Sequence, residues 1–243
     1  MTQGGLLLLF SCMALSMLIF SRYRVRYLWG LGFLLSLVAL ALNQTRNAWV
    51  GLVLAVSLIL FLYKPKALII VPFAVGLFYL ASPLPLKKRA LSIFSLKPLS
   101  NMERIEYMRA GIKIIKDFPL FGTGPNTVEM VFQNPKYGLS KIPKSNVHLH
   151  NNILQIGAER GIPTLLAWLT FMVWAFCSLL KLLKNKDPTL RPFTVAALGA
   201  LFALFTAGLF EYNFADSEIT ALFLYMITVP FSLARLKEKE GKA

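Results

Sequence analysis

The chain has 243 residues, of which 56% are hydrophobic and 15% are charged, and its formal net charge is +15. A soluble domain carries about 25% charged residues, so this composition excludes an ordinary soluble protein and indicates a membrane protein. The basic residues gather in short loops between long apolar runs, as the loops of membrane proteins do, which argues against a nucleic-acid-binding protein.

Seven uncharged runs of 16 to 21 residues are each close to the length of about 20 residues that a helix needs to cross a bilayer. The runs cover residues 1–21, 27–45, 47–63, 67–86, 161–180, 192–210 and 219–234. The sequence therefore predicts an all-α, polytopic membrane helix bundle of about seven spans. We divide it into transmembrane helices 1–4 (residues 1–85), a large extracytoplasmic loop (86–160), and transmembrane helices 5–7 with a cytoplasmic tail (161–243).

The distribution of lysine and arginine predicts the orientation of the bundle. These residues are concentrated in the loops after the first, third and fifth runs and in the C-terminal tail. Short cytoplasmic loops collect positive charge, so we expect those loops and the tail in the cytoplasm and the N-terminus outside. The 86–160 loop holds twelve Lys and Arg against five acidic residues, but loops of this length cross regardless of charge. It is predicted to lie outside the cytoplasm.

Within the large loop, residues 101–118 predict a helix with Asn101 as its N-cap. Its apolar stripe at helical spacing consists of Ile105, Met108, Ile112 and Ile115. Arg104 lies on the same side, so we expect it to be buried against an anionic partner, either an acidic side chain or a phosphate. A proline and a glycine-rich turn (residues 119–124) are predicted to end this helix.

Residues 145–160 predict a second short helix at the outer membrane surface, with His150 and Asn151 near its start. His148 and His150 are the two histidines of the chain. The sequence Gly-Ile-Pro at 161–163 is expected to break the helix before the next span. Ionisable residues placed where a polar loop meets a membrane helix are a functional-site candidate.

Several chemistries lack their signatures. Two histidines separated by one residue, with no cysteine or carboxylate at ligand spacing, match a zinc site poorly. The sequence has no phosphate-binding glycine loop for nucleotides and no serine-hydrolase elbow. A histidine can take a proton from a sugar hydroxyl near neutral pH, and arginines can neutralise a diphosphate without a metal. From the residues alone, a structural or headgroup-facing histidine explains the pattern at least as well, and an Arg46 that snorkels to lipid headgroups is the favoured interpretation of that residue.

Three motifs in order resemble a known family. Residues 150–151 (HN), followed after nine residues by 161–164 (GIPT), are similar to the signature of the bacterial O-antigen ligase and polymerase superfamily. Residues 45–49 (TRNAW), and Arg104 together with 119–124 (PLFGTG), resemble the same family.

This resemblance, over residues 28–180, implies a GT-C-like membrane glycosyltransferase in the bacterial inner membrane, with its site on the periplasmic or extracellular face. It implies transfer of a glycan from an undecaprenyl-diphosphate carrier to a lipid or glycan acceptor, with inversion and with no metal or other cofactor. By matched position, His150 is the general base, and Arg46 and Arg104 bind the diphosphate. The secondary candidates are His148, Arg109 and Asn151.

Two other functions remain open. The first is a transporter or flippase subunit whose arginines bind a lipid phosphate without chemistry, although the sequence shows no broken helices at mid-span and no inverted repeat. The second is an inactive, truncated homologue. Members of the resembling family usually have ten or more spans, so the resemblance implies that an N-terminal part is missing here, as in a fragment, a split gene product or a short homologue. The sequence does not separate a ligase from a polymerase.

Overall fold

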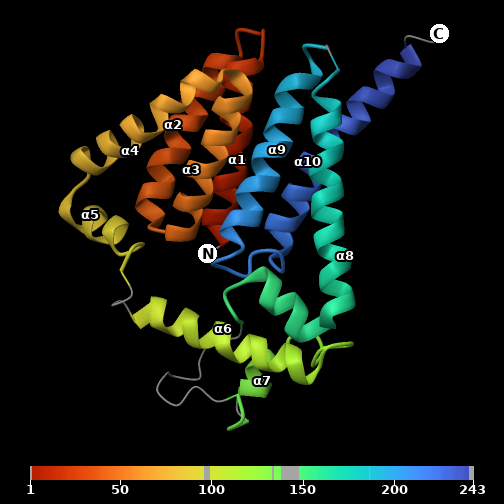
Figure 1. Cartoon of the computed structure of the whole chain (residues 1–243). Coiled ribbons are helices and arrows are strands. Elements are labelled where there is room, and N and C mark those ends of the chain that lie inside the picture. The colour runs from red at the N-terminus through yellow and green to blue at the C-terminus, as the bar shows by residue number, and fades with distance from the viewer. Residues whose placement is uncertain (1, 96–98, 133, 138–147, 186, 241–243) are drawn as a thin grey trace.

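The computed structural model describes residues 2–95, 99–132, 134–137, 148–185 and 187–240 (Figure 1). These residues form helices joined by turns and loops, with no β-strand among them, which confirms the predicted all-α class. Six of the described helices are long and apolar enough to cross a membrane. They are α1 (Thr2–Phe20), α2 (Arg26–Asn43), α3 (Arg46–Tyr63), α8 (Asn152–Leu182), α9 (Leu190–Ala207) and α10 (Ser217–Glu240).

Helix α9 lies at the centre of the bundle. Of its apolar segment 78% is buried, against 11% for α2, which lies at the edge. Small residues on α9 and its neighbours allow close approach: a Cβ on Gly199 would lie 2.9 Å from Ile59 of α3, and one on Gly51 of α3 would lie 3.0 Å from the Ala203 carbonyl oxygen. Small residues at helix contacts are the usual means by which membrane helices pack.

The fourth predicted span differs from the others. It consists of a 3₁₀ turn η1 (Pro65–Ile69) continued by α4 (Ile70–Ala81), which slants away from the end of α3 (Figure 1). This segment ends at Ser82, and Pro83 precedes the short basic helix α5 (Leu84–Leu91). Together η1 and α4 cover residues 65–81 and are shorter than the six helices that could cross a membrane. A seventh span therefore stays a prediction.

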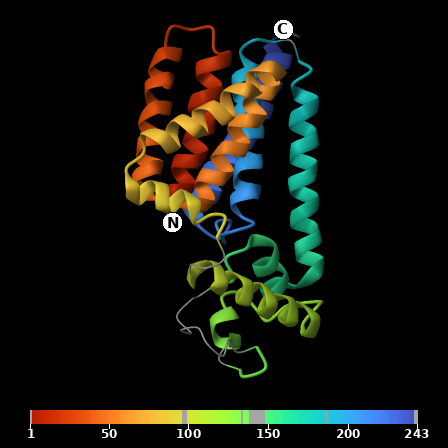
Figure 2. The ribbon, with the colours of Figure 1, turned by 60° about the vertical axis from the view of Figure 1, so that its left-hand side comes forward.

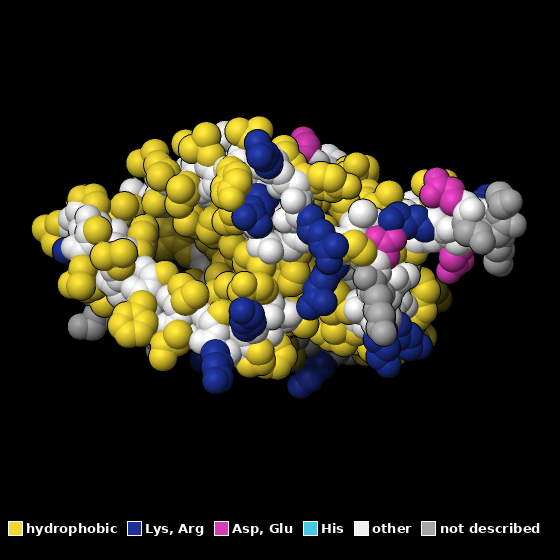
Figure 3. Space-filling view, turned by 90° about the horizontal axis from the view of Figure 1, so that it is seen from above, with side chains coloured by type: hydrophobic (Ala, Val, Ile, Leu, Met, Phe, Trp, Pro, Cys, Tyr) yellow, Lys and Arg dark blue, Asp and Glu magenta, His cyan; other side chains and the backbone are white. Residues whose placement is uncertain are grey.

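The two ends of the bundle carry different elements. The α1–α2 and α8–α9 connections lie at one end, together with the end of α3 and the C-terminal part of α10 (Figure 1). Lysine and arginine side chains run across that face (Figure 3). Beyond the opposite end lie α6 (Leu99–Asp117) and α7 (Val128–Phe132), as a layer outside the bundle (Figure 2).

Helix α6 begins earlier than predicted, so the assignment of Asn101 as N-cap is wrong. Asn101 lies inside the helix, and its side-chain amide donates hydrogen bonds to the carbonyl oxygens of Ser92 (3.1 Å) and Ser95 (2.6 Å). This side chain therefore ties α6 to the end of α5.

The predicted apolar stripe of α6 is also wrong, because Met108 and Ile112 are exposed. The buried face consists of Tyr107, Ala110, Gly111 and Ile114. An aliphatic stripe is a poor guide here because an aromatic ring and two small residues form the contact surface. Gly111 admits Leu149, whose side chain would lie 3.0 Å from a Cβ at that position.

The second predicted helix begins at Asn152, so His150 and Asn151 precede it; residues 145–147 lie outside the described part of the chain. It continues into the span as α8, with a sharp bend at Gly161 (φ 79°, ψ 171°), which confirms the predicted break. A Cβ on Gly161 would lie 2.1 Å from the carbonyl oxygen of Leu120, so the close approach of this turn requires glycine.

The glycine-rich turn at 119–124 docks on this bend. The amides of Thr123 and Gly124 donate to the carbonyl oxygens of Ala158 and Glu159, both at 2.9 Å. A Cβ on Gly122 would lie 2.3 Å from the carbonyl carbon of Glu159. These amides are used to join α6 to α8, which fixes both elements relative to the segment that carries the histidines.

Candidate active site

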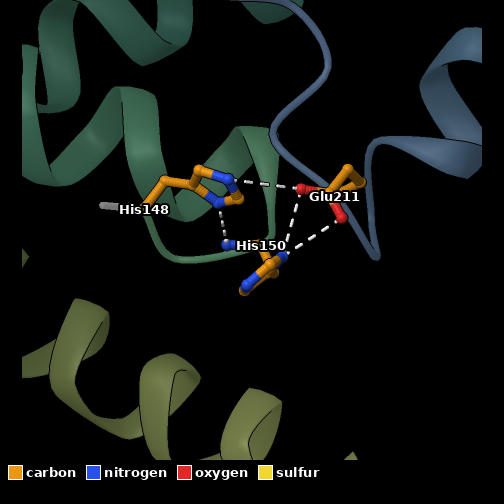
Figure 4. A group of neighbouring side chains, drawn as sticks. All are labelled: His148, His150 and Glu211. Atoms are coloured by element: carbon orange, nitrogen blue, oxygen red, sulfur yellow. Dashed lines mark hydrogen bonds and ion pairs between the residues drawn. The ribbon is translucent and has the colours of Figure 1, made fainter. Parts of the chain in front are cut away.

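His148, His150 and Glu211 meet at the end of the bundle that carries α6 and α7 (Figures 1 and 4). The histidines precede α8, and Glu211 lies in the loop between α9 and α10. Nδ1 of His150 is 3.1 Å from each carboxylate oxygen of Glu211, and Nε2 of His148 is 3.6 Å from Oε1. The chain separation of His150 and Glu211 is 61 residues, so the fold alone creates this cluster.

Asn151 fixes the position of His150. Its Oδ1 accepts a hydrogen bond from the Leu154 amide at 3.0 Å and so caps α8, while its Nδ2 donates to the Leu209 carbonyl oxygen at 2.9 Å. His150 has a positive φ of 51°, an uncommon conformation for a residue with a side chain. Asn151 therefore acts here through structure, by holding the histidine segment against the α9–α10 loop.

Asn152, which sequence reasoning missed, strengthens the same junction. Its Nδ2 donates to Oδ1 of Asn213 at 2.8 Å, and its Oδ1 accepts from the amide of Phe214 at 3.2 Å. The backbone amide of Asn152 donates to the Gly208 carbonyl oxygen at 2.8 Å. A buried amide side chain with its groups satisfied on both sides makes a rigid link, because breaking it would leave polar atoms unpaired.

The electrostatics of the cluster keep Glu211 ionised. Burial raises the pKa of Glu211, but the hydrogen bond to His150 and the charges of His150, His148 and Arg104 together hold it below the usual value. Burial lowers the pKa of His148, and the charges of His150 and Arg104 lower it further. Glu211 opposes this shift, but the pKa of His148 remains below its usual value. At neutral pH Glu211 is a carboxylate and His148 is neutral.

A carboxylate facing Nδ1 of His150 decides which nitrogen carries the proton. Glu211 can only accept, so Nδ1–H donates to it, and in the neutral ring the lone pair lies on Nε2. Figure 4 shows the other ring nitrogen of His150 pointing away from Glu211. The ring of Tyr107 lies against His150, with the centroids 5.8 Å apart. This arrangement leaves an oriented proton acceptor at Nε2.

Arg104 reaches the cluster from α6. Its Nη2 is 3.9 Å from Oε2 of Glu211, and its side chain is 22% exposed, so the anionic partner expected from the sequence is an acidic side chain. Burial lowers the pKa of the Arg104 guanidinium, Glu211 opposes this, and the positive charge of Arg89 adds to it. Arginine stays protonated even so.

Arg46 and Arg89 complete an arginine cluster with Arg104. Arg46, in the first turn of α3, is buried and donates from Nη1 to the carbonyl oxygen (3.0 Å) and hydroxyl (3.1 Å) of Ser92. It interacts electrostatically with Arg89 and Arg104. Arg89, exposed on α5, donates from Nε to the Gln44 carbonyl oxygen at 3.2 Å. Sequence reasoning missed Arg89, because it follows two lysines and resembles an ordinary basic surface run.

Among the secondary candidates, His148 joins the cluster and Arg109 does not. The rings of His148 and His150 lie 4.3 Å apart, and Nδ1 of His148 accepts from the His150 amide at 3.4 Å. Arg109 points outward from α6 with a side chain that is 69% exposed, and it pairs with Glu106 at 2.8 Å.

The same three residues form a candidate metal site. One ligand atom from each of His148, His150 and Glu211 lies within 4.8 Å of the others. The sequence argument against a metal assumed that no carboxylate lies near the histidines, and Glu211 overturns that assumption. The guanidinium of Arg104 next to the carboxylate nevertheless opposes a divalent cation, because like charges repel strongly in a partly buried site. The residues fit an oriented histidine better than a metal centre.

The fold and this cluster define a multi-pass helical membrane protein with a histidine–carboxylate pair beside an arginine cluster. A family model described as O-antigen ligase matches residues 31–169, which are 139 of the 243 residues (169 − 31 + 1). The chain therefore belongs to the O-antigen ligase family, as the sequence motifs indicate. No curated protein matches it.

Family membership gives the coarse function of the protein. It is a membrane protein of the ligase or polymerase-like glycosyltransferase type, whose substrates are lipid-linked glycans. The matched range contains Arg46, Arg89, Arg104 and His150 but ends before Glu211.

Proposed function

We propose that this protein transfers a glycan from an undecaprenyl-diphosphate carrier to a hydroxyl group of an acceptor, with His150 as the general base. The observation that carries the proposal is the pairing of Nδ1 of His150 with the buried carboxylate of Glu211, beside three arginines. A histidine whose one nitrogen is held by a carboxylate has its other nitrogen aimed as a proton acceptor, as in other acid–base sites.

The reaction follows from that geometry. Nε2 of His150 removes the proton from the acceptor hydroxyl as its oxygen attacks the anomeric carbon of the donor sugar. The bond between that carbon and the diphosphate oxygen breaks, and its electron pair leaves with the diphosphate. The imidazolium that forms is stabilised by Glu211. Attack from the side opposite the leaving group inverts the anomeric carbon.

The arginine cluster supplies the charge that a diphosphate needs. Arg46, Arg89 and Arg104 contribute three positive charges, and Glu211 and Glu103 contribute two negative charges, which leaves a surplus of one. Guanidinium groups bind phosphate oxygens through paired hydrogen bonds, and they stabilise the charge that develops on the leaving group. The chemistry thus needs no metal.

The proposed site faces the periplasm or the cell exterior. It lies at the end of the bundle opposite the lysine- and arginine-rich loops (Figures 1 and 3). The positive-inside rule assigns those loops to the cytoplasm of a bacterial inner membrane. The acceptor is a lipid core or protein for a ligase, and another carrier-linked glycan for a polymerase.

The test is glycan transfer in a bacterial host that lacks its own ligase and polymerase. Wild type is compared with His150→Ala, Arg104→Ala and the matched control Arg109→Ala, all at equal levels in the membrane. We expect transfer by wild type and Arg109→Ala and its loss in the other two. Full transfer by His150→Ala would overturn the catalytic assignment, because in this host transfer would then proceed without the proposed base. No transfer by an inserted wild type would contradict the proposal for this chain.

A further inference from the structure

A cavity of about 210 Å³ opens beside Glu211, and nothing in the proposed chemistry uses it. Its polar lining includes Thr2, Asn47, His148, Glu211, Tyr212 and Asp216. Asn213 completes the polar lining, and small or aliphatic residues of α1, α3, α9 and α10 line the rest. His150 is not among the lining residues, so the cavity adjoins the proposed base through His148 and Glu211.

The charge of the cavity differs from that of the arginine cluster. Two carboxylates, Glu211 and Asp216, line it, and no lysine or arginine is among its lining residues. In a chain with a net charge of +15, this makes it a locally acidic compartment. A phosphate would be repelled here, whereas a neutral molecule with several hydroxyl groups would find acceptors in the carboxylates.

The start of α3 separates the two compartments. Arg46 and Asn47 are consecutive residues of that helix, and successive side chains on an α-helix point about 100° apart. Arg46 is directed to Ser92 and the arginine cluster, while Asn47 lines the cavity. The donor diphosphate at the arginines and a ligand in the cavity would therefore lie on different sides of the histidine–glutamate group.

The size and lining of the cavity fit one sugar ring. A volume of about 210 Å³ is many times the roughly 10–15 Å³ of such space that one water molecule needs, so the cavity admits a molecule much larger than water. A sugar ring has hydroxyl groups at its edge and C–H groups on its faces. The carboxylates, the Asn47 amide and the Thr2 hydroxyl suit that edge, and the apolar lining with the Tyr212 ring suits the faces.

We propose that this cavity binds one uncharged sugar ring of the acceptor on the Glu211 side of His150, as a neighbour of the ring whose hydroxyl meets Nε2. That this sugar belongs to the acceptor rests on the proposed transfer reaction. Binding of a sugar in the cavity can be measured without any transfer. The carboxylate of Asp216, which accepts a hydrogen bond from the Thr2 hydroxyl, and the amide of Asn47 are the polar groups that select the ring.

The experiment is ligand-observed NMR on the purified full chain in detergent micelles, with methyl glycosides of glucose, galactose and N-acetylglucosamine as probes. Glucose 1-phosphate is the anionic comparison. We expect at least one methyl glycoside to bind wild type and His150→Ala alike, and to bind Asn47→Leu and Asp216→Leu about tenfold more weakly, since each loses hydrogen bonds to the ring. Lys113→Gln, an exposed change on α6, is the control.

Three results would overturn the inference: no glycoside binding by wild type, equal binding by Asn47→Leu and Asp216→Leu, or glucose 1-phosphate binding that these two changes weaken more than they weaken glycoside binding. The outcomes are separable from those of the transfer reaction. Sugar binding in a wild type that transfers nothing supports the cavity and contradicts the proposed reaction. Transfer whose dependence on acceptor concentration is unchanged in Asn47→Leu supports the reaction and contradicts the cavity.

Discussion

Glu211 lies with both carboxylate oxygens 3.1 Å from Nδ1 of His150, although the two residues belong to different connections of the bundle. Asn151 and Asn152 hold these two connections together through hydrogen bonds to Leu209 and Asn213. The orientation of the proposed base is therefore a property of the junction between α8 and the α9–α10 loop, and changes on either side of it have distinct expected effects.

Replacing Glu211 by glutamine tests the role of its charge. Glutamine keeps the size of the side chain but cannot stabilise the imidazolium, and its amide can reverse the preferred tautomer of His150. We expect the initial rate of glycan transfer in membranes to fall about 10²- to 10⁴-fold in Glu211→Gln. Glu211→Asp, which retains the charge at a longer distance, should lose less. An unchanged rate in Glu211→Gln would show that the pair is structural.

The low pKa of Glu211 predicts how stability depends on pH. In the unfolded chain this carboxyl binds a proton near its ordinary pKa of 4.5, whereas in the fold its pKa lies lower. The unfolded state therefore binds more protons in the acid range, so the contribution of Glu211 is present above pH 4.5 and is lost as the pH falls through the folded pKa.

Thermal unfolding in detergent, measured from neutral to acid pH, checks this effect. We expect the midpoint of wild type to fall more steeply below pH 4.5 than that of Glu211→Gln. His148, whose pKa is also lowered, adds a separate loss that begins near its ordinary value of 6.5, and His148→Gln isolates it. Parallel curves for wild type and Glu211→Gln would contradict the assigned shift.

The contribution of Arg89 to diphosphate binding can be tested with a matched control on the same helix. Arg89 is exposed on α5, so Arg89→Ala should leave folding unchanged while removing one positive charge from the cluster. We expect the half-saturating donor concentration to rise about tenfold, as for loss of a charge-assisted hydrogen bond. Lys88→Ala, the preceding residue on the same helix, should have little effect. Equal effects of the two changes would mean that only the general basic charge of α5 matters.

The glycines at the bend of α8 are expected to be essential for folding. Gly161→Ala would place a Cβ 2.1 Å from the Leu120 carbonyl oxygen at a φ of +79°, and Gly122→Ala would place one 2.3 Å from the backbone of Glu159 at a φ of +66°. Both should strongly reduce the amount of folded protein recovered from membranes. Gly76→Ala on α4, where no atom lies within 4 Å, is the control and should stabilise its helix by up to about 1 kcal/mol.

A metal test separates the two chemistries that His148, His150 and Glu211 could support. If His150 is an oriented base, chelators leave the transfer rate unchanged, and added Zn²⁺ inhibits by occupying the nitrogens and the carboxylate. The rate is measured in washed membranes before and after chelation, with readdition of each metal. Loss of transfer on chelation and its return with one metal would establish a metal centre instead.

Local patterns predicted six of the membrane helices and the break at Gly161. Each of these depends on residues close in sequence: the length of the apolar runs, and a glycine two residues before a proline. Glu211 escaped because an acidic, aromatic loop between two spans looks like an ordinary solvated turn, and only the fold brings it to a histidine 61 residues away. The buried face of α6 was not predicted because Tyr107 and Gly111, which lie outside the aliphatic stripe, form it.

The connection between α8 and α9 lies at the end of the bundle far from His150 (Figure 1). Cleaving the chain there would place His150 and Glu211 on two separate polypeptides and leave every helix intact. The two halves, expressed together, would regain the pair only where α8 and α9 meet again in the bilayer. The site would then serve as a reporter of helix association, with restored glycan transfer as the signal that two membrane fragments have found each other.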